Sequence, residues 1–163
     1  DGELEVRHMG RVARGVRGIK LKGTDEIAGL EMLESDASML LLTVTENGYG
    51  KRTAIDKYRV QGRGGQGVIN MVVDDRNGLV VGSVQVHDTD LIMMMTNTGR
   101  VIKIPVVNIR ETQSRAAKGV RLMRVEDNER IVSVTRVVEP EEDDELLMEE
   151  LSTGDEAVAG LEE

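Results

Sequence analysis

The chain contains three copies of one short basic segment, spaced 52 residues apart, and this repetition limits the folds open to it. The copies are "GRVARGV" at 10–16, "GRGGQGV" at 62–68 and "SRAAKGV" at 114–120. Each begins with a small residue followed by arginine and ends in Gly-Val. A fixed period of this kind is typical of repeated supersecondary units that pack against their neighbours.

The sequence between these copies predicts short strands. Apolar residues alternate after each Gly-Val, at 19–21, 71–73 and 123–125. The segments 39–55 and 90–106 have the pattern of hairpins that turn at Gly48 and Gly99, since Asn and Gly tolerate positive φ. Runs rich in β-branched residues follow at 76–86 and 128–137, with a weaker one at 24–33. One repeat therefore predicts four short strands joined by glycine-containing turns.

Radial repetition of four-stranded sheets predicts an all-β, propeller-like architecture. We expect residues 1–138 to form an incomplete ring of blades of about 50 residues each, with repeats at about 6–57, 58–109 and 110–138. Two full repeats and half of a third are too few to close a ring, so we expect the chain to be a piece of a longer protein. Residues 139–163 form an acidic segment that we expect to be disordered.

The charge of the chain is divided between these two parts. The formal net charge is −9, but residues 139–163 hold 12 acidic and no basic residues, which leaves 18 acidic and 21 basic residues in 1–138. A mildly basic body with an acidic tail suggests that the body binds a polyanion. In one hypothesis the tail carboxylates compete with this polyanion for the body; the alternative is a tail that only promotes solubility.

Other features of the composition restrict the class of function. The chain has no cysteine, which excludes disulfides and thiolate metal sites, and no apolar run reaches the roughly 18 residues of a membrane helix. The two histidines, His8 and His87, lack ligand spacing, so we expect no metal and no cofactor. Tyr49 and Tyr58 are the only aromatic residues, too few to stack on single-stranded bases, which favours duplex nucleic acid.

The second copy also fits the dinucleotide-binding pattern G-x-G-x-x-G through Gly62, Gly64 and Gly67. That fingerprint must open a helix, because the phosphate binds at the helix N-terminus. Here the apolar run "GVINMVV" follows and predicts a strand. We therefore expect these glycines to serve a tight loop or a close approach to the backbone. The enzyme hypothesis, a nucleotide-dependent oxidoreductase, requires a helix after Gly67 and a pocket.

Long stretches of the sequence resemble the C-terminal domain family of the gyrase A subunit, part of a bacterial type II topoisomerase. The resemblance rests on "ARGVRGIKL" at 13–21, "LTVTENGYGKRTAI" at 42–55, "GRGGQGVINM" at 62–71, "RNGLVVGSVQV" at 76–86 and "SRAAKGVRLMRV" at 114–125. It implies a β-pinwheel whose blades exchange strands and bend duplex DNA around a basic outer rim. This chain resembles the last two to three blades and the acidic tail.

The resemblance implies that the family's defining seven-residue box, Q-R-R-G-G-K-G, lies in the first blade, which we expect this chain to lack; a box-like loop is present on a later blade. The segment "QGRGGQG" at 61–67 is similar to the box, with Gly62 where the box has Arg and Gln66 where it has Lys. Since two charges are missing, we expect this loop to contact DNA without being the principal anchor. The candidate DNA-binding residues, taken from the recurring cations and this loop, are Arg11, Arg14, Arg17, Lys20, Lys51, Arg52, Arg63, Gly64, Gly65, Gln66, Gly67, Arg100, Lys103, Arg115, Lys118 and Arg121.

The function that follows from the resemblance is sequence-nonspecific DNA binding and wrapping by a non-catalytic domain. Its partners would be double-stranded DNA, the remainder of the gyrase A polypeptide and the gyrase B polypeptide, in an ATP-hydrolysing A2B2 topoisomerase that introduces negative supercoils. We expect it in the cytoplasm, at the nucleoid, with no membrane contact. Two alternatives stay open: the equivalent C-terminal domain of topoisomerase IV, and a propeller-like scaffold that binds proteins and no nucleic acid.

Overall fold

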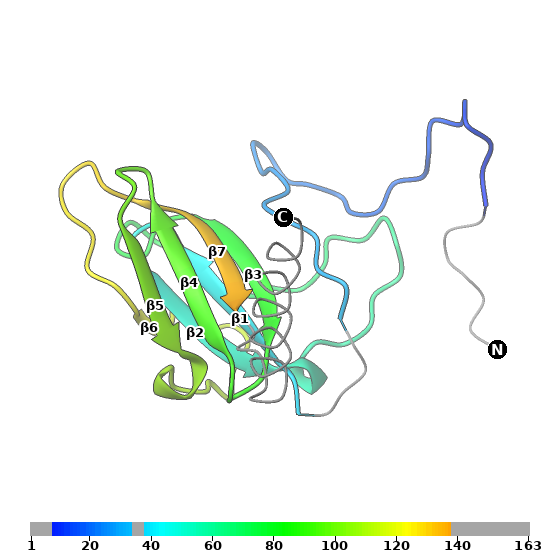
Figure 1. Cartoon of the computed structure of the whole chain (residues 1–163). Coiled ribbons are helices and arrows are strands. Elements are labelled where there is room, and N and C mark those ends of the chain that lie inside the picture. Colours follow the sequence, from blue (N-terminus) through cyan, green and yellow to red (C-terminus); the bar gives the residue numbers. More distant parts are fainter. Residues whose placement is uncertain (1–7, 34–37, 138–163) are drawn as a thin grey trace, which may run out of the picture.

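The computed structural model describes residues 8–33 and 38–137, and within these ranges the protein is all-β (Figure 1). Seven strands form two antiparallel sheets in the described part, and its only helical elements are two single 3-10 turns. The acidic segment 139–163, for which we predicted disorder, lies outside the described residues. The predicted fold class, an open propeller-like array of strands, is confirmed.

Each sheet contains one hairpin, as the sequence predicts. The first comprises β1 (Leu40–Thr45) and β2 (Tyr49–Ala54), and the second comprises β4 (Leu91–Thr96) and β5 (Val101–Pro105). Their turn glycines, Gly48 and Gly99, have φ of 81° and 82°, a left-handed conformation that favours glycine. Each hairpin ends in a 3-10 turn, η1 (Ile55–Lys57) or η2 (Val106–Asn108).

Each hairpin receives its third strand from the following repeat. Strand β3 (Val80–Val86) pairs with β1, and β7 (Ile131–Val137) pairs with β4. Both pairings contain an irregularity near the hairpin turn, between Val44 and Thr45 and between Met95 and Thr96. A two-residue strand, β6 (Val120–Arg121), completes the first sheet beside β2, giving the orders β3-β1-β2-β6 and β5-β4-β7.

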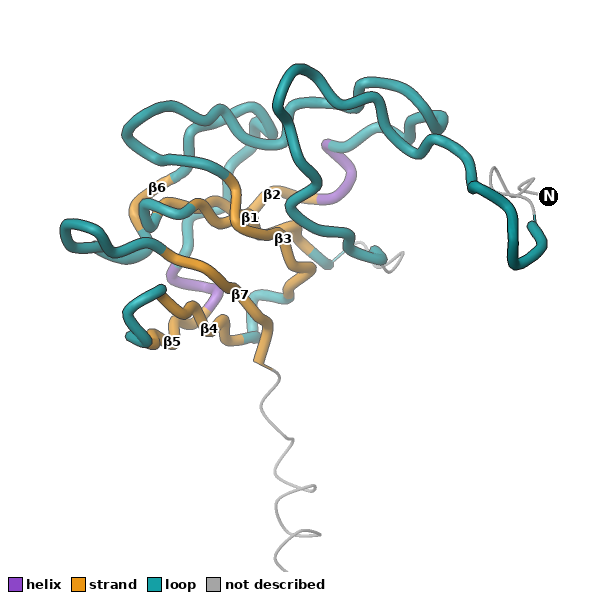
Figure 2. The backbone as a smooth tube through the Cα atoms, turned by 90° about the horizontal axis from the view of Figure 1, so that it is seen from above, coloured by secondary structure: helices purple, strands orange, loops and turns teal. Residues whose placement is uncertain are grey.

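The two sheets lie against each other (Figure 2), and they share one hydrophobic core. From β1 the core takes Leu42 and Val44, whereas from β4 it takes Ile92 and Met94. In the strand pairing, Met94 of β4 corresponds to Thr43 of β1. Met94 belongs to the core and Thr43 does not, so the two hairpins turn opposite faces toward the shared core. Strand β1 is buried along its whole length. Strands β4 and β5 alternate between more buried and more exposed residues, so the second sheet leaves one face more open.

The segment 24–33 departs from the prediction, because it forms no strand and all of its residues are exposed. A strand needs a partner for its backbone groups, and within the described residues 24–33 has none in a sheet. The runs at 19–21 and 71–73 are likewise outside the regular strands.

Candidate nucleic-acid interface

Three loops that carry the repeated segment lie side by side, although 52 residues separate each from the next. We call them the first basic loop (residues 10–20), the second basic loop (61–72) and the third basic loop (114–121). The Lys20 amide donates to the Gly65 carbonyl at 2.7 Å, and the Gly64 amide donates to the Gly18 carbonyl at 2.6 Å. On the other side, the Val72 amide donates to the Ala117 carbonyl at 3.1 Å. The second loop is therefore hydrogen-bonded to both of the others.

The glycines of the repeated segment are required by the backbone conformation. Gly15, Gly67 and Gly119 occupy the same place in the three loops and have φ of 79°, 73° and 78°. Only glycine adopts this region at little cost. At Gly119 a Cβ would also lie 2.6 Å from the Gly50 carbonyl oxygen, so the third loop passes close to strand β2.

No helix follows Gly67, because residues 67–73 are irregular. The dinucleotide-binding interpretation fails for this reason, although the predicted strand after Gly67 is absent too. Gly64 and Gly67 provide the turns of this loop, since both have positive φ, of 76° and 73°.

A network of polar side chains fixes the two ends of the second basic loop on the sheet. The Tyr58 hydroxyl donates to Asn70 Oδ1 at 2.6 Å, which joins the start of the loop to its end. Asn70 Nδ2 donates to Thr43 Oγ1 at 2.8 Å, and Thr43 bonds Ser83 Oγ at 3.0 Å. These residues were not among the predicted site residues. A single asparagine in the apolar run "VINMVV" was the only signal that could have indicated them.

Lys51 lies beneath this network and is fully buried. Its ammonium donates to Thr53 Oγ1 at 2.8 Å and lies 3.4 Å from the Tyr58 hydroxyl. Desolvation by burial, with a smaller contribution from the Arg115 charge, lowers the pKa of Lys51 to about 8. Its ammonium cannot reach a phosphate, so its predicted role as a DNA contact does not fit the structure.

Arg52 is also buried and serves the structure of the sheet. Its guanidinium donates to the Ile109 carbonyl and forms an ion pair with Asp88, and its own carbonyl accepts from the Thr112 amide at 2.8 Å. These contacts join β2 to the segment that leads to the third basic loop. The predicted DNA contact by Arg52 therefore does not fit its position either. A strand residue that points to a covered face has the same sequence signature as one that points to solvent.

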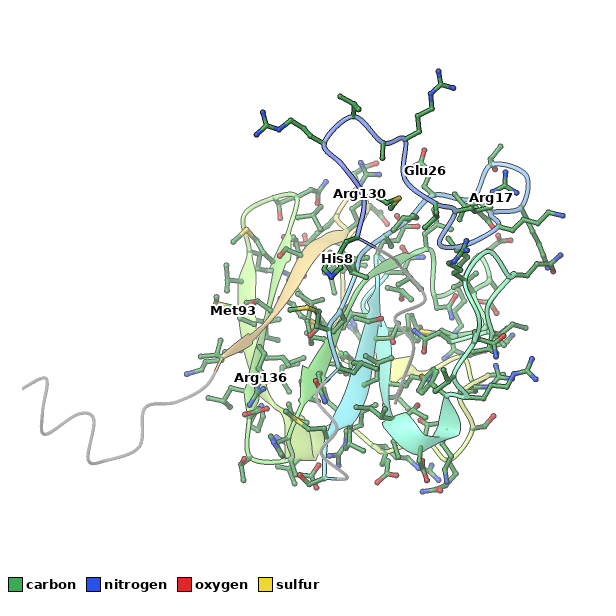
Figure 3. All side chains as sticks on the ribbon, turned by 90° about the vertical axis from the view of Figure 1, so that its right-hand side faces the viewer. His8, Arg17, Glu26, Met93, Arg130 and Arg136 are labelled. Atoms are coloured by element: carbon green, nitrogen blue, oxygen red, sulfur yellow. The ribbon has the colours of Figure 1, made fainter. Side chains whose placement is uncertain are left out.

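The other predicted cations lie at the surface or close to it. Arg11, Arg14, Arg17 and Lys20 are exposed, and none of them forms an ion pair with another described residue. Figure 3 shows Arg17 at the edge of the molecule, away from the strands. Arg63 and Lys103 are exposed too, as are Gly65, Gln66 and Gly67, whereas Gly64 is half-buried.

Four further predicted cations have partners that the structure defines. Lys118 pairs with Asp74 at 2.6 Å, and Arg100 pairs with Glu129 at 2.6 Å. The half-buried Arg115 donates to the Ile69 carbonyl and so connects the third loop to the second. These contacts reduce the charge that Lys118 and Arg100 can offer to a polyanion, whereas Arg121 bonds only the neutral Tyr49 hydroxyl, at 2.7 Å.

Three adjacent basic loops lie on an open array of β-blades, and this arrangement defines the chain as a propeller-like domain built of repeated blades. The family model described as "DNA gyrase C-terminal domain, beta-propeller" matches residues 4–34, 40–86 and 90–137. The chain belongs to this family.

Individual relatives agree with the family assignment. The chain is 46% identical over 159 residues to the DNA gyrase A subunit of Salmonella typhimurium, covering 96% of this chain and 18% of that protein. It is 41% identical over 142 residues to the DNA gyrase A subunit of Staphylococcus aureus, covering 87% of this chain and 16% of that protein. The chain thus spans less than a fifth of the length of these relatives.

Two solved structures share the fold over most of the chain. The C-terminal domain of DNA gyrase A superposes with a TM-score of 0.74 at 29% identity, covering 82% of this chain and 45% of that one. The C-terminal domain of DNA topoisomerase IV gives a TM-score of 0.73 at 27% identity, covering 82% of this chain and 41% of that one.

The part of the chain that the structure describes contains no helix with the length and apolar character that a membrane span requires.

Proposed function

We propose that this chain binds duplex DNA without sequence specificity, along the three basic loops, and wraps it as part of a larger topoisomerase. The observation that carries the proposal is the hydrogen-bonded alignment of the loops, in which Gly65 contacts Lys20 and Ala117 contacts Val72. Aligned loops present cations at intervals along one edge, which is what contact with successive phosphates requires.

The composition of this surface favours the duplex over single strands. Tyr49 is buried and Tyr58 is half-buried, so neither offers an open ring on which a base could stack. Phosphate contacts carry no base information, which accounts for the expected lack of sequence specificity. Bending a few tens of base pairs costs roughly 1–10 kcal/mol, and contacts spread over several loops can offset that cost.

In the whole protein, we infer that the domain directs the geometry of the DNA that the enzyme acts on. The catalytic steps, ATP hydrolysis and strand passage, belong to the remainder of the gyrase A polypeptide and to the gyrase B polypeptide in an A2B2 assembly. The expected location is the cytoplasm, at the nucleoid. The relatives described above are gyrase A proteins, which favours gyrase over topoisomerase IV, although both solved folds superpose almost equally well.

The test is a salt series of duplex affinity for the wild type and for a double variant, Arg14→Ala with Arg17→Ala. We expect the slope of log K against log[salt] to imply several phosphates, at about −0.9 per phosphate, and to become shallower by about 1 to 2 in the double variant. Fluorescence anisotropy of a labelled duplex measures both quantities.

The matched control is Arg110→Ala with Arg130→Ala, since both residues are exposed and lie outside the three loops. The control variant also loses two positive charges, and it should keep most of the slope of log K against log[salt]. Equal losses in the two double variants would favour the protein-binding scaffold, for which the cations have no common surface. Single-stranded DNA of equal length should bind more weakly than the duplex.

A further inference from the structure

A polar pocket lies where the third basic loop ends, between the start of β2 and the turn at 124–129. Its volume is about 400 Å³, and its lining includes Tyr49, Arg76, Arg121 and Arg124. Of these, only Arg121 was predicted as a site residue. We call it the Tyr49 pocket.

Two guanidiniums are held over one aromatic ring in this pocket. The Arg76 guanidinium lies 4.7 Å from the centre of the Tyr49 ring, and that of Arg121 lies 5.3 Å from it. Arg121 also donates to the Tyr49 hydroxyl at 2.7 Å from Nη2, and the two residues face each other in the pairing of β2 with β6. Tyr49 is only 4% exposed. The sheet therefore fixes the position of the hydroxyl and of the arginine that bonds it.

The positive charge of the pocket is not balanced by ion pairs. Arg76, Arg121 and Arg124 form no ion pair with another described residue. The buried Glu129 is engaged elsewhere, since its carboxylate bonds Arg100 at 2.6 Å and the Glu126 amide at 3.0 Å.

Two exposed carboxylates, those of Glu126 and Asp127, also line the pocket. The guanidiniums of Arg76 and Arg121 lie over the same ring and repel each other, because both are positively charged. An anion bound between them would remove that repulsion.

The pKa of Tyr49 reflects the positive charges of these arginines. Its hydrogen bonds to Arg121 and Arg76 hold the pKa of Tyr49 below its ordinary value, against the effect of burial. A phenol that accepts a hydrogen bond from arginine still has its own O–H to donate. The pocket thus offers guanidinium and hydroxyl donors to a single group that carries several oxygen atoms.

We propose that the Tyr49 pocket binds a phosphate group, with Arg76, Arg121 and Arg124 donating to its oxygens and the Tyr49 hydroxyl donating a further bond. Two sources can supply this phosphate, the backbone of a duplex and free inorganic phosphate. The duplex is the favoured source, because the third basic loop runs directly into the pocket at Arg121. That part of the inference rests on the proposed function, whereas binding of inorganic phosphate does not.

The two tyrosines allow a direct test with the full chain. Carbon-13 at the Cζ position of tyrosine reports ionisation by NMR, and only Tyr49 and Tyr58 give signals; Tyr58→Phe assigns them. We expect inorganic phosphate, compared with chloride at equal ionic strength, to raise the pKa of Tyr49 because a bound anion stabilises the neutral phenol. Arg76→Ala and Arg124→Ala should each weaken this binding about tenfold or more, and Arg110→Ala should leave it unchanged.

The same signal distinguishes the two sources of phosphate. A shift with both ligands, or with a short duplex alone, supports a backbone phosphate, and a shift with inorganic phosphate alone supports a site for the free anion. A Tyr49 signal that neither ligand moves overturns the proposal, as does a shift that survives both arginine variants. If anisotropy shows duplex binding while neither the duplex nor inorganic phosphate moves the Tyr49 signal, the pocket is refuted and the proposed function stands.

Discussion

Lys51 and Arg52 are neighbours in the sequence, and both are buried, but their environments differ. Arg52 has an ion-pair partner in Asp88 and a carbonyl partner at Ile109. Lys51 has only hydroxyl partners, Thr53 and Tyr58, and so bears the cost of a buried charge. A positive charge in this sequence is therefore no guide to exposure.

The pKa of Lys51 predicts how stability depends on pH. Its folded value of about 8 lies below the ordinary 10.5, so between these values the unfolded chain binds the additional proton. The free energy of unfolding should therefore rise with pH between about 8 and 10. Above this window the raised pKa of Tyr58 has the opposite effect, because the unfolded tyrosine ionises first.

Lys51→Met tests this explanation. The variant removes the buried charge and keeps the length of the side chain, so we expect it to be more stable than the wild type at pH 7, by at most about 3 kcal/mol. It should also lose most of the rise between pH 8 and 10. Urea denaturation at both pH values measures the difference, with Lys57→Met as an exposed control. The lowered pKa of Tyr49 also makes the free energy of unfolding rise with pH, but it does so equally in the wild type and both variants, so the comparison is unaffected. A destabilised Lys51→Met with an unchanged pH profile would contradict the explanation.

At the scale of the elements, the two hairpins have the same turn but different surroundings. Gly48 and Gly99 both have positive φ, yet a Cβ on Gly48 would lie 2.2 Å from the Met123 carbonyl oxygen, whereas a Cβ on Gly99 would meet nothing within 4 Å. Gly48 therefore has a second role, which is the close approach of the chain that follows the third basic loop.

This difference predicts unequal effects of the same substitution. Gly99→Ala should lower the free energy of unfolding by about 1–2 kcal/mol, the cost of a left-handed alanine. Gly48→Ala should lower it by about 3 kcal/mol or more, since the backbone contact must also give way. Urea denaturation of both variants at pH 7 measures this. Similar losses would mean that residues 122–123 move aside at little cost.

At the scale of the whole molecule, charge is divided between a basic body and an acidic segment. Residues 139–163 lie outside the described part of the chain, and they carry 12 of the 30 acidic residues. A polyanion joined to a basic surface competes with DNA at a high effective concentration.

Removing residues 139–163 should therefore tighten duplex binding at low salt. The gain should fall as salt is added, because both interactions are screened. Anisotropy titrations of the full chain and of residues 1–138 at two salt concentrations measure it. A useful control replaces the acidic residues of the segment by their amides at constant length. Unchanged affinity after removal would show that the segment does not compete with DNA.

Much of the architecture was predictable because it repeats along the sequence. The spacing of the Gly-Val segments, the two hairpins and the runs that became β3 and β7 are local patterns, and local patterns reflect strand period and turn chemistry. The strand expected at 24–33 was wrong because a strand also needs a partner, and propensity does not supply one.

The sequence by itself determined that this protein is built of repeated antiparallel hairpins with basic, glycine-containing loops between them. Only the tertiary structure decided which cations reach solvent. Lys51 and Arg121 carry the same charge, but one lies beneath the second basic loop and the other opens into the Tyr49 pocket. The physical reason is that exposure depends on what packs against each face, and those contacts join residues of different repeats, such as Tyr49 with Arg121.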